Sequence, residues 1–91
     1  MRVKKADLDQ ACRVINRITG SPMEPWTRDD KGKLHGNIGC YHLTGAYGGW
    51  GLVRMDNVNG GIRTIIGGYM PKRELLGKMA SFIEGLHAAA E

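Results

Sequence analysis

The hydrophobic residues of this sequence change their spacing twice along the chain, and this change is the feature that most restricts the fold. Near both ends they recur at helical spacing, whereas between residues 34 and 66 they alternate as in β-strands. Two amphipathic helices each need an apolar surface to cover, and a three-stranded meander supplies one. The pattern therefore predicts a two-layer α+β fold in the order helix, three-stranded antiparallel sheet, helix (αβββα).

The first helical segment carries its own start and stop signals. Asp7 is expected to cap its first turn, and Gly20 is expected to end it. Its expected apolar stripe consists of Leu8, Ala11, Cys12, Ile15 and Ile18. The residues predicted to face away from this stripe are Arg13, Asn16 and Arg17.

The middle of the chain is predicted to form three strands, over residues 34–43, 50–55 and 62–66. Residues 21–33 are expected to form an ordered loop or a short hairpin, and residues 44–49 a constrained glycine-rich loop. Residues 56–61 contain Asn59-Gly60, a strong signal for a hairpin turn. Gly67-Gly68 is expected to break the sheet, and Pro71 is expected to open a second helix that runs to about Ala89.

Length and charge limit the classes of protein that fit. The chain of 91 residues is long enough for one domain with one core, preceded by a flexible basic N-terminus over residues 1–5. A formal net charge of +4 is mildly basic, well short of a dedicated nucleic-acid binder with a dense cationic face. We see no signal peptide and no membrane helix, so a reducing cytoplasm is the expected location. Cys12 and Cys40 are expected to be buried free thiols, although a disulfide stays open.

If both helices cover one face of the sheet, the other face is open to a partner. Six aromatic and arginine side chains are candidates for that face or its edges: Tyr41, Tyr47, Trp50, Arg54, Arg63 and Tyr69. Aromatic rings beside guanidinium groups can stack on a base and pair with a phosphate. The alternative interpretation is that the tryptophan packs in the core and the arginines lie in solvent.

Two further features point to a ligand. Gly48 and Gly49 let the backbone approach another group closely, either in a ligand pocket or across a subunit interface, with ordinary turn chemistry as the alternative. Lys72 and Arg73 follow Pro71 at the start of the second helix, where backbone N–H groups favour an anion, with two solvated side chains as the alternative. The predicted ligand-binding residues are therefore Tyr41, Tyr47, Gly48, Gly49, Trp50, Arg54, Arg63, Tyr69, Lys72 and Arg73.

No motif indicates catalysis. His35, His42 and His87 have no metal-ligand spacing with one another or with the cysteines. Cys40 and His42 are two residues apart in a predicted strand, but nothing else of a catalytic triad is evident. We therefore expect no enzymatic activity, no catalytic residue, no metal and no cofactor.

Several short segments together resemble a group of small uncharacterised proteins encoded by tailed bacteriophages and prophages. They are Glu24-Pro25-Trp26-Thr27, residues 37–43, Ala46-Tyr47-Gly48-Gly49, residues 52–55, Gly60-Gly61 and Lys72-Arg73-Glu74-Leu75. The likeness runs over most of the chain. It implies a viral accessory protein expressed in a bacterial cytoplasm, and it brings no catalytic residues.

This resemblance and the candidate residues lead to a functional hypothesis. The chain is expected to be a counter-defence binder, which either sequesters a nucleotide-type signalling ligand or blocks a host protein. An oligomer would create pockets between subunits, so a homo-oligomer is expected. No membrane partner is expected.

Two different functions stay open. The order of elements is also that of the double-stranded RNA-binding domain, and Pro71-Lys72-Arg73 with Lys78 is loosely similar to its basic helix start. Residues 44–49 lack the histidine of the minor-groove loop, and Glu74 interrupts the basic cluster, so a duplex RNA- or DNA-binding module is the alternative. A minor virion or assembly protein is the second alternative.

Overall fold

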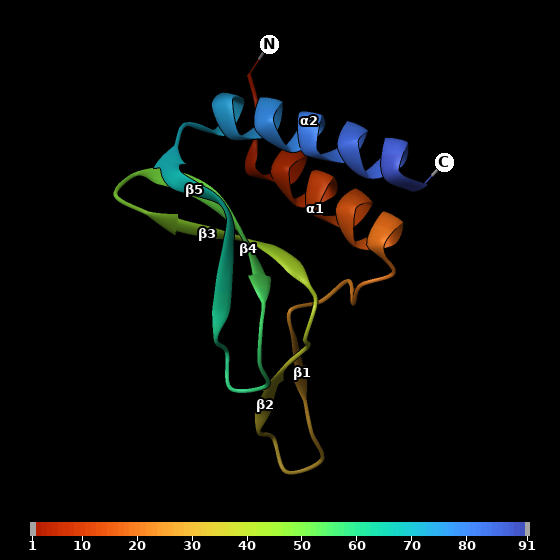
Figure 1. The fold of residues 1–91 in the computed structure, drawn as a ribbon. Helices are drawn as coiled ribbons and strands as arrows, with labels where there is room; N and C mark the ends of the chain where they lie inside the picture. Colours follow the sequence, from red (N-terminus) through yellow and green to blue (C-terminus); the bar gives the residue numbers. More distant parts are fainter. Residues whose placement is uncertain (1, 91) are drawn as a thin grey trace.

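The computed structural model describes residues 2–90, and it confirms the α+β architecture (Figure 1). The elements are α1 (Lys5–Thr19), β1 (Trp26–Arg28), β2 (Leu34–Gly36), β3 (Tyr41–Ala46), β4 (Gly49–Met55), β5 (Ile62–Met70) and α2 (Lys72–Ala90). Helix α1 contacts α2 and β3, and α2 also contacts β4 and β5, so the two helices form one layer on the sheet. Strands β1 and β2 form a short hairpin, one of the two forms expected for residues 21–33, and it projects away from the helices.

The main sheet is antiparallel, in the order β3-β4-β5. Leu43 lies opposite Leu52, and Leu52 lies opposite Ile66, so these three side chains define the face that the helices cover. The next paired positions on that face place Trp50 opposite Met70. Strands β3 and β5 are the two edges of this sheet.

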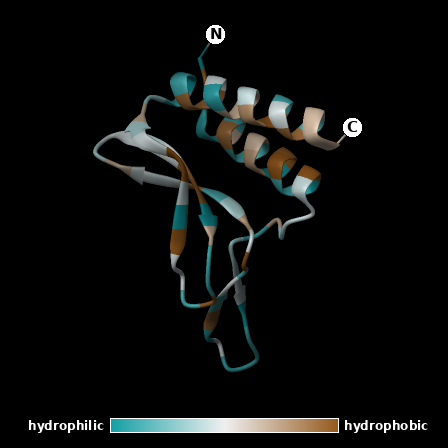
Figure 2. Ribbon diagram, in the orientation of Figure 1, coloured by the Kyte–Doolittle hydropathy of each residue, from teal (hydrophilic) through white to brown (hydrophobic). Residues whose placement is uncertain are grey.

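The core lies between the two layers. Its buried residues are Leu8, Ala11, Cys12, Ile15, Leu52, Met70, Leu75 and Met79. In Figure 2 hydrophobic residues recur along α1, which contacts α2 and β3. The core therefore joins both helices to the central strand, and it leaves the β1–β2 hairpin outside.

The first helix begins earlier than predicted. It starts at Lys5, and the side chain of Asp7 accepts a hydrogen bond of 2.8 Å from the backbone N–H of Lys4. Asp7 is thus in the first helical turn, where a carboxylate satisfies a free N–H and interacts favourably with the helix dipole. Gly20 ends the helix with a left-handed φ of 71°, as predicted.

The strand predicted over residues 34–43 is wrong, because residues 37–40 form a turn between β2 and β3. Gly39 has a φ of 97° there, which no regular strand contains. The turn stays attached to β4, since Gly39 N–H donates to Met55 O and Met55 N–H donates to Cys40 O, both at 2.8 Å. Cys40 is consequently buried in a turn and does not share a strand face with Leu34.

The predicted loop over residues 44–49 is also wrong. Residues 44–46 belong to β3, and Gly49 already belongs to β4, so only Tyr47 and Gly48 connect the strands. Both have positive φ, 53° and 75°, which is the conformation of a type I′ hairpin turn. Of the glycines between residues 45 and 51, Gly48 alone has the positive φ of the turn.

The third strand is longer than predicted. Gly67-Gly68 does not break the sheet, because β5 continues to Met70, which pairs with Trp50. The extra residues are absorbed by irregularities in the β4–β5 register. Gly49 lies so close to β5 that an added Cβ would meet the carbonyl carbon and oxygen of Tyr69 at 2.7 Å. This glycine is needed for the close approach of two backbones.

Candidate functional site

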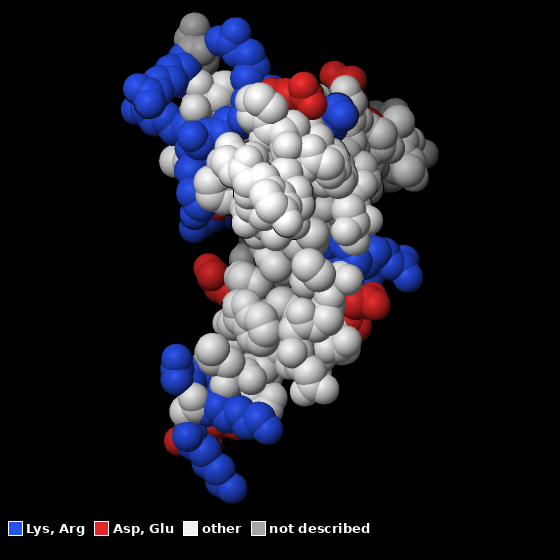
Figure 3. Space-filling view, turned by 90° about the vertical axis from the view of Figure 1, so that its left-hand side faces the viewer, with Lys and Arg blue, Asp and Glu red and all other residues white. Residues whose placement is uncertain are grey.

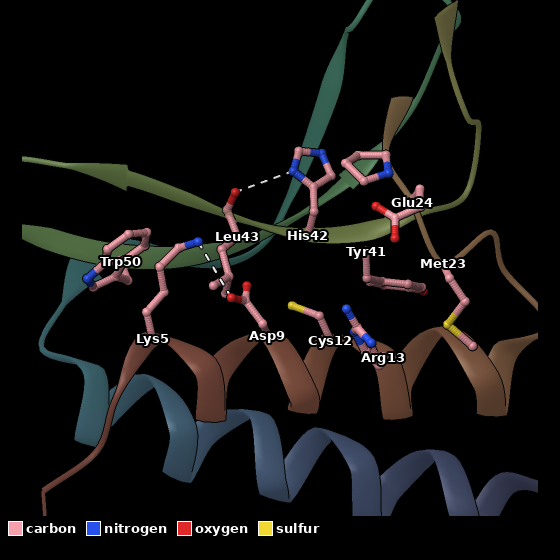
Figure 4. Close-up of a pocket in the computed structure, with 11 residues that line it drawn as sticks. Lys5, Asp9, Cys12, Arg13, Met23, Glu24, Tyr41, His42, Leu43 and Trp50 are labelled. Carbon is pink, nitrogen blue, oxygen red and sulfur yellow. Dashed lines mark hydrogen bonds and ion pairs between the residues drawn. The ribbon is translucent and has the colours of Figure 1, made fainter. Parts of the chain in front are cut away.

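A groove lies between α1 and the edge strand β3, and the segment 23–25 closes one of its ends (Figure 4). Its volume is about 340 Å³. We call it the α1–β3 groove, and it is lined by Lys5, Asp9, Cys12, Arg13, Met23, Glu24, Pro25, Tyr41, His42, Leu43 and Trp50. This volume is at the lower end of the range of ligand pockets.

Asn16 lies at the Tyr41 end of the groove and shows how the strand edge is oriented. Its side-chain Oδ1 accepts a hydrogen bond of 2.8 Å from Tyr41 N–H, and its Nδ2 donates one of 3.0 Å to Tyr41 O. The amide thus occupies both backbone groups of Tyr41, as a neighbouring strand would. Asn16 is 1% exposed, so the prediction that it faces away from the apolar stripe is wrong.

The backbone of β3 continues this edge along the groove. In an antiparallel ladder alternate residues direct their N–H and C=O groups to opposite sides. Since Tyr41 directs its groups to Asn16, Leu43 and Gly45 direct theirs to the same outer side. The edge therefore offers backbone groups to a partner next to a groove with an apolar floor.

Charged groups of both signs surround the groove. Lys5 Nζ lies 3.5 Å from Asp9 Oδ2 and 6.0 Å from the centre of the Trp50 ring. Because Lys5 and Asp9 are half exposed, their ion pair is weak and easily exchanged for contacts with a partner. Figure 4 places Arg13 on the helix side and Glu24 on the opposite wall. The groove thus presents two cations and two carboxylates.

Two side chains in the wall have distinctive protonation or hydrogen bonding. Burial, with a smaller contribution from the charge of Asp9, raises the pKa of the Cys12 thiol to about 12, which makes it a poor nucleophile. His42 Nδ1 lies 3.3 Å from Leu43 O. Its Nε2 is a buried side-chain nitrogen with no hydrogen-bond partner among residues 2–90. His42 therefore has unused hydrogen-bonding capacity beside the groove.

The structure distributes the predicted ligand residues over four places. Tyr41 and Trp50 line the groove, on the face that the helices cover and not on the open face. Tyr41 packs on Phe82, with ring centres 6.0 Å apart. The ring of Trp50 lies over Gly45, where an added Cβ would meet it at 3.1 Å. Both aromatic residues are thus partly core and partly site.

The remaining predicted residues do not line the groove. Tyr47, Gly48 and Gly49 form the β3–β4 turn, where the Tyr47 ring meets that of Tyr69 edge-on at 5.7 Å. Arg54 and Arg63 are paired across β4 and β5 at the opposite end of these strands, and Arg54 lies 5.9 Å from the Tyr41 ring. Lys72 and Arg73 begin α2, directly after β5. The ten residues do not form one site.

Most of the groove is not evident from the sequence. In the sequence, nothing distinguishes Lys5, Asp9 and Arg13 from other polar helix positions, and nothing indicates that they lie beside a strand edge. Asn16 carries a usable signal, because it lies four residues after Cys12 and eight after Leu8 on the apolar stripe. A polar residue at such a position is buried only if its hydrogen bonds are satisfied.

Comparison of the chain with known protein families, with curated proteins and with solved structures gives no match in any of the three. The resemblance to phage accessory proteins therefore stays a prediction. Within residues 2–90, no group of three or more His, Cys, Asp or Glu side chains is placed to hold a metal ion. In the same part of the chain, no helix is long and apolar enough to cross a membrane.

Proposed function

We propose that this protein is a non-enzymatic binding protein that captures an extended segment of another protein by adding it as a strand to the edge of β3. One observation carries the proposal: Asn16 already holds this edge at Tyr41 with the pair of hydrogen bonds that a strand would make. Leu43 and Gly45 extend the same edge along the groove. Strand addition draws affinity from backbone bonds and specificity from side-chain pockets.

The size of the groove fits a short peptide. The residues of α1 that line it run from Lys5 to Arg13, which are eight residues apart in the sequence. At about 1.5 Å per helical residue this is about 12 Å, which corresponds to about four residues of extended chain. The floor is apolar at Leu43 and Tyr41, whereas the walls are charged. The expected ligand alternates apolar residues with charged residues of both signs.

Capture of a protein segment corresponds to the version of the counter-defence hypothesis in which the protein blocks a host protein. A viral accessory protein of this kind would act stoichiometrically, by occupying a segment of a host protein. The charge of the groove supports a peptide more than a nucleotide, since its two cations are matched by two carboxylates. Of the residues predicted to bind a nucleotide, Tyr41 and Trp50 line the groove, whereas the basic residues Arg54, Arg63, Lys72 and Arg73 do not.

Duplex binding and a virion role receive less support from the surface. A duplex-binding protein needs several cations on one face. On the face shown in Figure 3, most Lys and Arg lie at the upper left and at the lower end, others lie beside acidic residues at the right margin, and the centre is uncharged. A virion or assembly role does not require a groove beside an open strand edge.

The test begins with selection of linear peptides from a random displayed library on the purified protein. The best peptide is synthesised, and its affinity is measured by fluorescence anisotropy. N-methylation at alternate backbone positions then separates strand addition from other modes. One alternate set is expected to weaken binding by about tenfold or more, because it removes hydrogen bonds to β3, and the other set is expected to have little effect.

Variants locate the site. Asp9→Lys and Arg13→Glu are expected to weaken the selected peptide, whereas Arg17→Glu, an exposed position on the same helix, serves as the matched control. Failure to select any peptide, or binding that tolerates every N-methyl group, would refute strand addition. Native mass spectrometry of the protein mixed with mononucleotides and cyclic dinucleotides tests whether it sequesters a nucleotide. A bound mass equal to that of one of these nucleotides would support sequestration.

A further inference from the structure

The loop between β4 and β5, over residues 56–61, contains an asparagine whose side chain is free to react. Asn59 is exposed in this loop. Its backbone N–H donates to Asn57 Oδ1 at 2.9 Å, but its own side-chain amide has no hydrogen-bond partner among residues 2–90. The α1–β3 groove does not include this loop, so peptide binding leaves the Asn59–Gly60 pair without a role.

The other three asparagines have side chains that are held by hydrogen bonds. Asn16 is buried and bonds to the edge of β3. Asn37 Nδ2 donates to Glu24 O at 2.8 Å. Asn57 Oδ1 accepts two backbone N–H groups of its own loop, both at 2.9 Å. Each of these three is also followed by a residue with a side chain: Arg17, Ile38 and Val58.

Gly60 leaves the Asn59 amide open to attack by the next backbone nitrogen. A side chain on the following residue would shield this nitrogen, and glycine has none. Gly60 N–H donates to Asn57 O at 3.3 Å, which is long for an N–H···O hydrogen bond, so the nitrogen is weakly held. Loop tips are the parts of a fold that move most easily. The Gly60 nitrogen can therefore approach the Asn59 side chain without disturbing the core.

The reaction that this arrangement permits needs only water. The Gly60 nitrogen gives its proton to solvent and attacks Asn59 Cγ, so that a bond between the two atoms forms. The bond between Cγ and Nδ2 breaks, and Nδ2 takes up a proton and leaves as ammonia. Water then opens the resulting succinimide ring at one of its two carbonyl carbons. Nothing is oxidised or reduced, and the neutral amide becomes a carboxylate.

The two products differ in the length of the backbone. Opening the ring at Cγ gives aspartate in a normal chain, whereas opening it at the main-chain carbonyl carbon gives isoaspartate, with one more methylene in the backbone. The loop is closed on both sides of this point. Asp56 N–H donates to Gly61 O at 2.8 Å, and Gly61 N–H donates to Asn57 Oδ1 at 2.9 Å. An added methylene between residues 59 and 60 is incompatible with these short bonds.

The same loop attaches the β1–β2 hairpin to the main sheet (Figure 1). Gly36 N–H donates to Val58 O at 2.8 Å. The Trp26 ring lies so close to Gly60 that an added Cβ there would meet it at 2.6 Å. These contacts are made by the two neighbours of Asn59 in the sequence. A longer backbone at Asn59 changes the position of Gly60 relative to Val58, so both contacts cannot persist unchanged.

We propose that Asn59 is a site of spontaneous conversion to aspartate and isoaspartate, and that the isoaspartate form releases the β1–β2 hairpin from the loop. The core does not include this loop or the hairpin, so it stays folded. The site is separate from the α1–β3 groove, and the inference does not depend on the proposed peptide binding.

The test begins with incubation of the purified protein in mildly alkaline buffer at physiological temperature. Proteolytic digestion and tandem mass spectrometry then locate the gain of about 1 Da that replaces an amide by a carboxyl group. Asn59 is expected to convert at least about tenfold faster than each of the other three asparagines. Equal rates at all four positions, or an intact Asn59, would overturn the site.

The structural effect is measured on the products, which carry one more negative charge and are separated by ion exchange. In the isoaspartate form, amides of the β1–β2 hairpin are expected to exchange hydrogen at least about tenfold faster than in fresh protein, while β4 amides keep their rates. Unchanged hairpin exchange in this form would overturn the release of the hairpin.

Two variants serve as matched controls. Asn59→Asp carries the new charge on a normal backbone and is expected to keep the hairpin exchange of fresh protein. Asn59→Ser lacks the amide, so incubation is expected to change neither its mass at this position nor its hairpin exchange. Fast exchange in Asn59→Asp would assign the effect to charge, and an equal loss of protection in incubated Asn59→Ser would assign it to another site. Either result contradicts the proposed cause.

Discussion

Asn16 joins the helical layer to the edge of the sheet through the two backbone groups of Tyr41. Replacing it with leucine, Asn16→Leu, keeps the branched shape of the side chain but leaves the Tyr41 N–H and C=O without these partners. Buried groups that lose their partners cost about 1–3 kcal/mol each. We expect the free energy of unfolding to fall by about 2–4 kcal/mol, measured by urea denaturation.

Asn59→Leu is the control for this substitution, because Asn59 lies in an exposed loop. Its effect is expected to stay within about 0.5 kcal/mol. Equal small losses in the two variants would mean that water replaces the Asn16 side chain at no cost. The role of Asn16 as a strand-like partner would then be wrong.

Cys12 makes the stability of the fold sensitive to alkaline pH. Burial raises the pKa of its thiol from 9.0 to about 12. Below pH 9 the thiol is protonated in both the folded and the unfolded chain, so its contribution there is constant. Between pH 9 and 12 only the unfolded chain loses the proton, and stability falls by up to about 1.4 kcal/mol per pH unit.

Urea denaturation across this range tests the effect against Cys12→Ala, which lacks the thiol and is expected to lose less stability as the pH rises. Part of the alkaline loss remains in the variant, because burial also raises the pKa of Cys40. Parallel pH profiles for the two proteins would show that Cys12 ionises as easily in the folded chain as in the unfolded one.

At the scale of elements, two glycines with open space around them respond to the same change in opposite ways. An added Cβ at Gly48 or at Gly85 meets nothing within 4 Å, so only the backbone decides the outcome. Gly48 has a φ of 75° in the β3–β4 turn, whereas Gly85 is inside α2. Gly48→Ala is expected to lower the free energy of unfolding by about 1 kcal/mol, and Gly85→Ala to raise it by about 0.5–1 kcal/mol.

Thermal and urea denaturation of both variants measure this difference, and each variant is the control for the other. A stabilising Gly48→Ala would contradict the type I′ turn. A destabilising Gly85→Ala would mean that the α2 surface at this position packs against something, such as another chain.

The elements that the sequence predicts well are those set by local rules. The apolar stripes and Gly20 locate the helices, because helix spacing and a left-handed end act within a few residues. The boundaries of β2, β3 and β5 follow from contacts between distant residues instead. Hydrogen bonds with Met55 hold the turn at residues 37–40 in place, and pairing with Trp50 keeps Met70 in the sheet. Neither contact can be predicted from the alternation of apolar and polar residues along the sequence.

The candidate site is harder to predict for the same reason. The chemistry of Tyr41 and Trp50 marks them as binding residues, but their place on the helix-covered face depends on the strand register. The groove itself exists because α1 lies along β3, and no local pattern states which strand a helix will follow. Only the polar Asn16 within an apolar stripe indicates that this helix makes hydrogen bonds with another element.

At the scale of the whole molecule, the fold divides into a well-packed part and a thin extension. The core joins α1, α2 and the sheet, whereas all three β1 residues are exposed. The β1–β2 hairpin is attached mainly through Gly36 N–H, which donates to Val58 O at 2.8 Å, and through Trp26, whose ring contacts Gly60. Few buried contacts imply a low free energy for local opening.

Native-state hydrogen exchange is therefore expected to show two levels of protection. Amides of Thr27 and His35 should exchange at least about 100-fold faster than those of Leu52 and Val53 in β4, because the hairpin opens while the core stays folded. Trp26→Ala removes the ring from Gly60 and is expected to accelerate exchange in the hairpin alone. If the hairpin amides exchange as slowly as the β4 amides, or if Trp26→Ala accelerates exchange equally in both, the hairpin unfolds with the core. The two parts would then form one cooperative unit, and Trp26 would contribute to global stability although its side chain is 41% exposed.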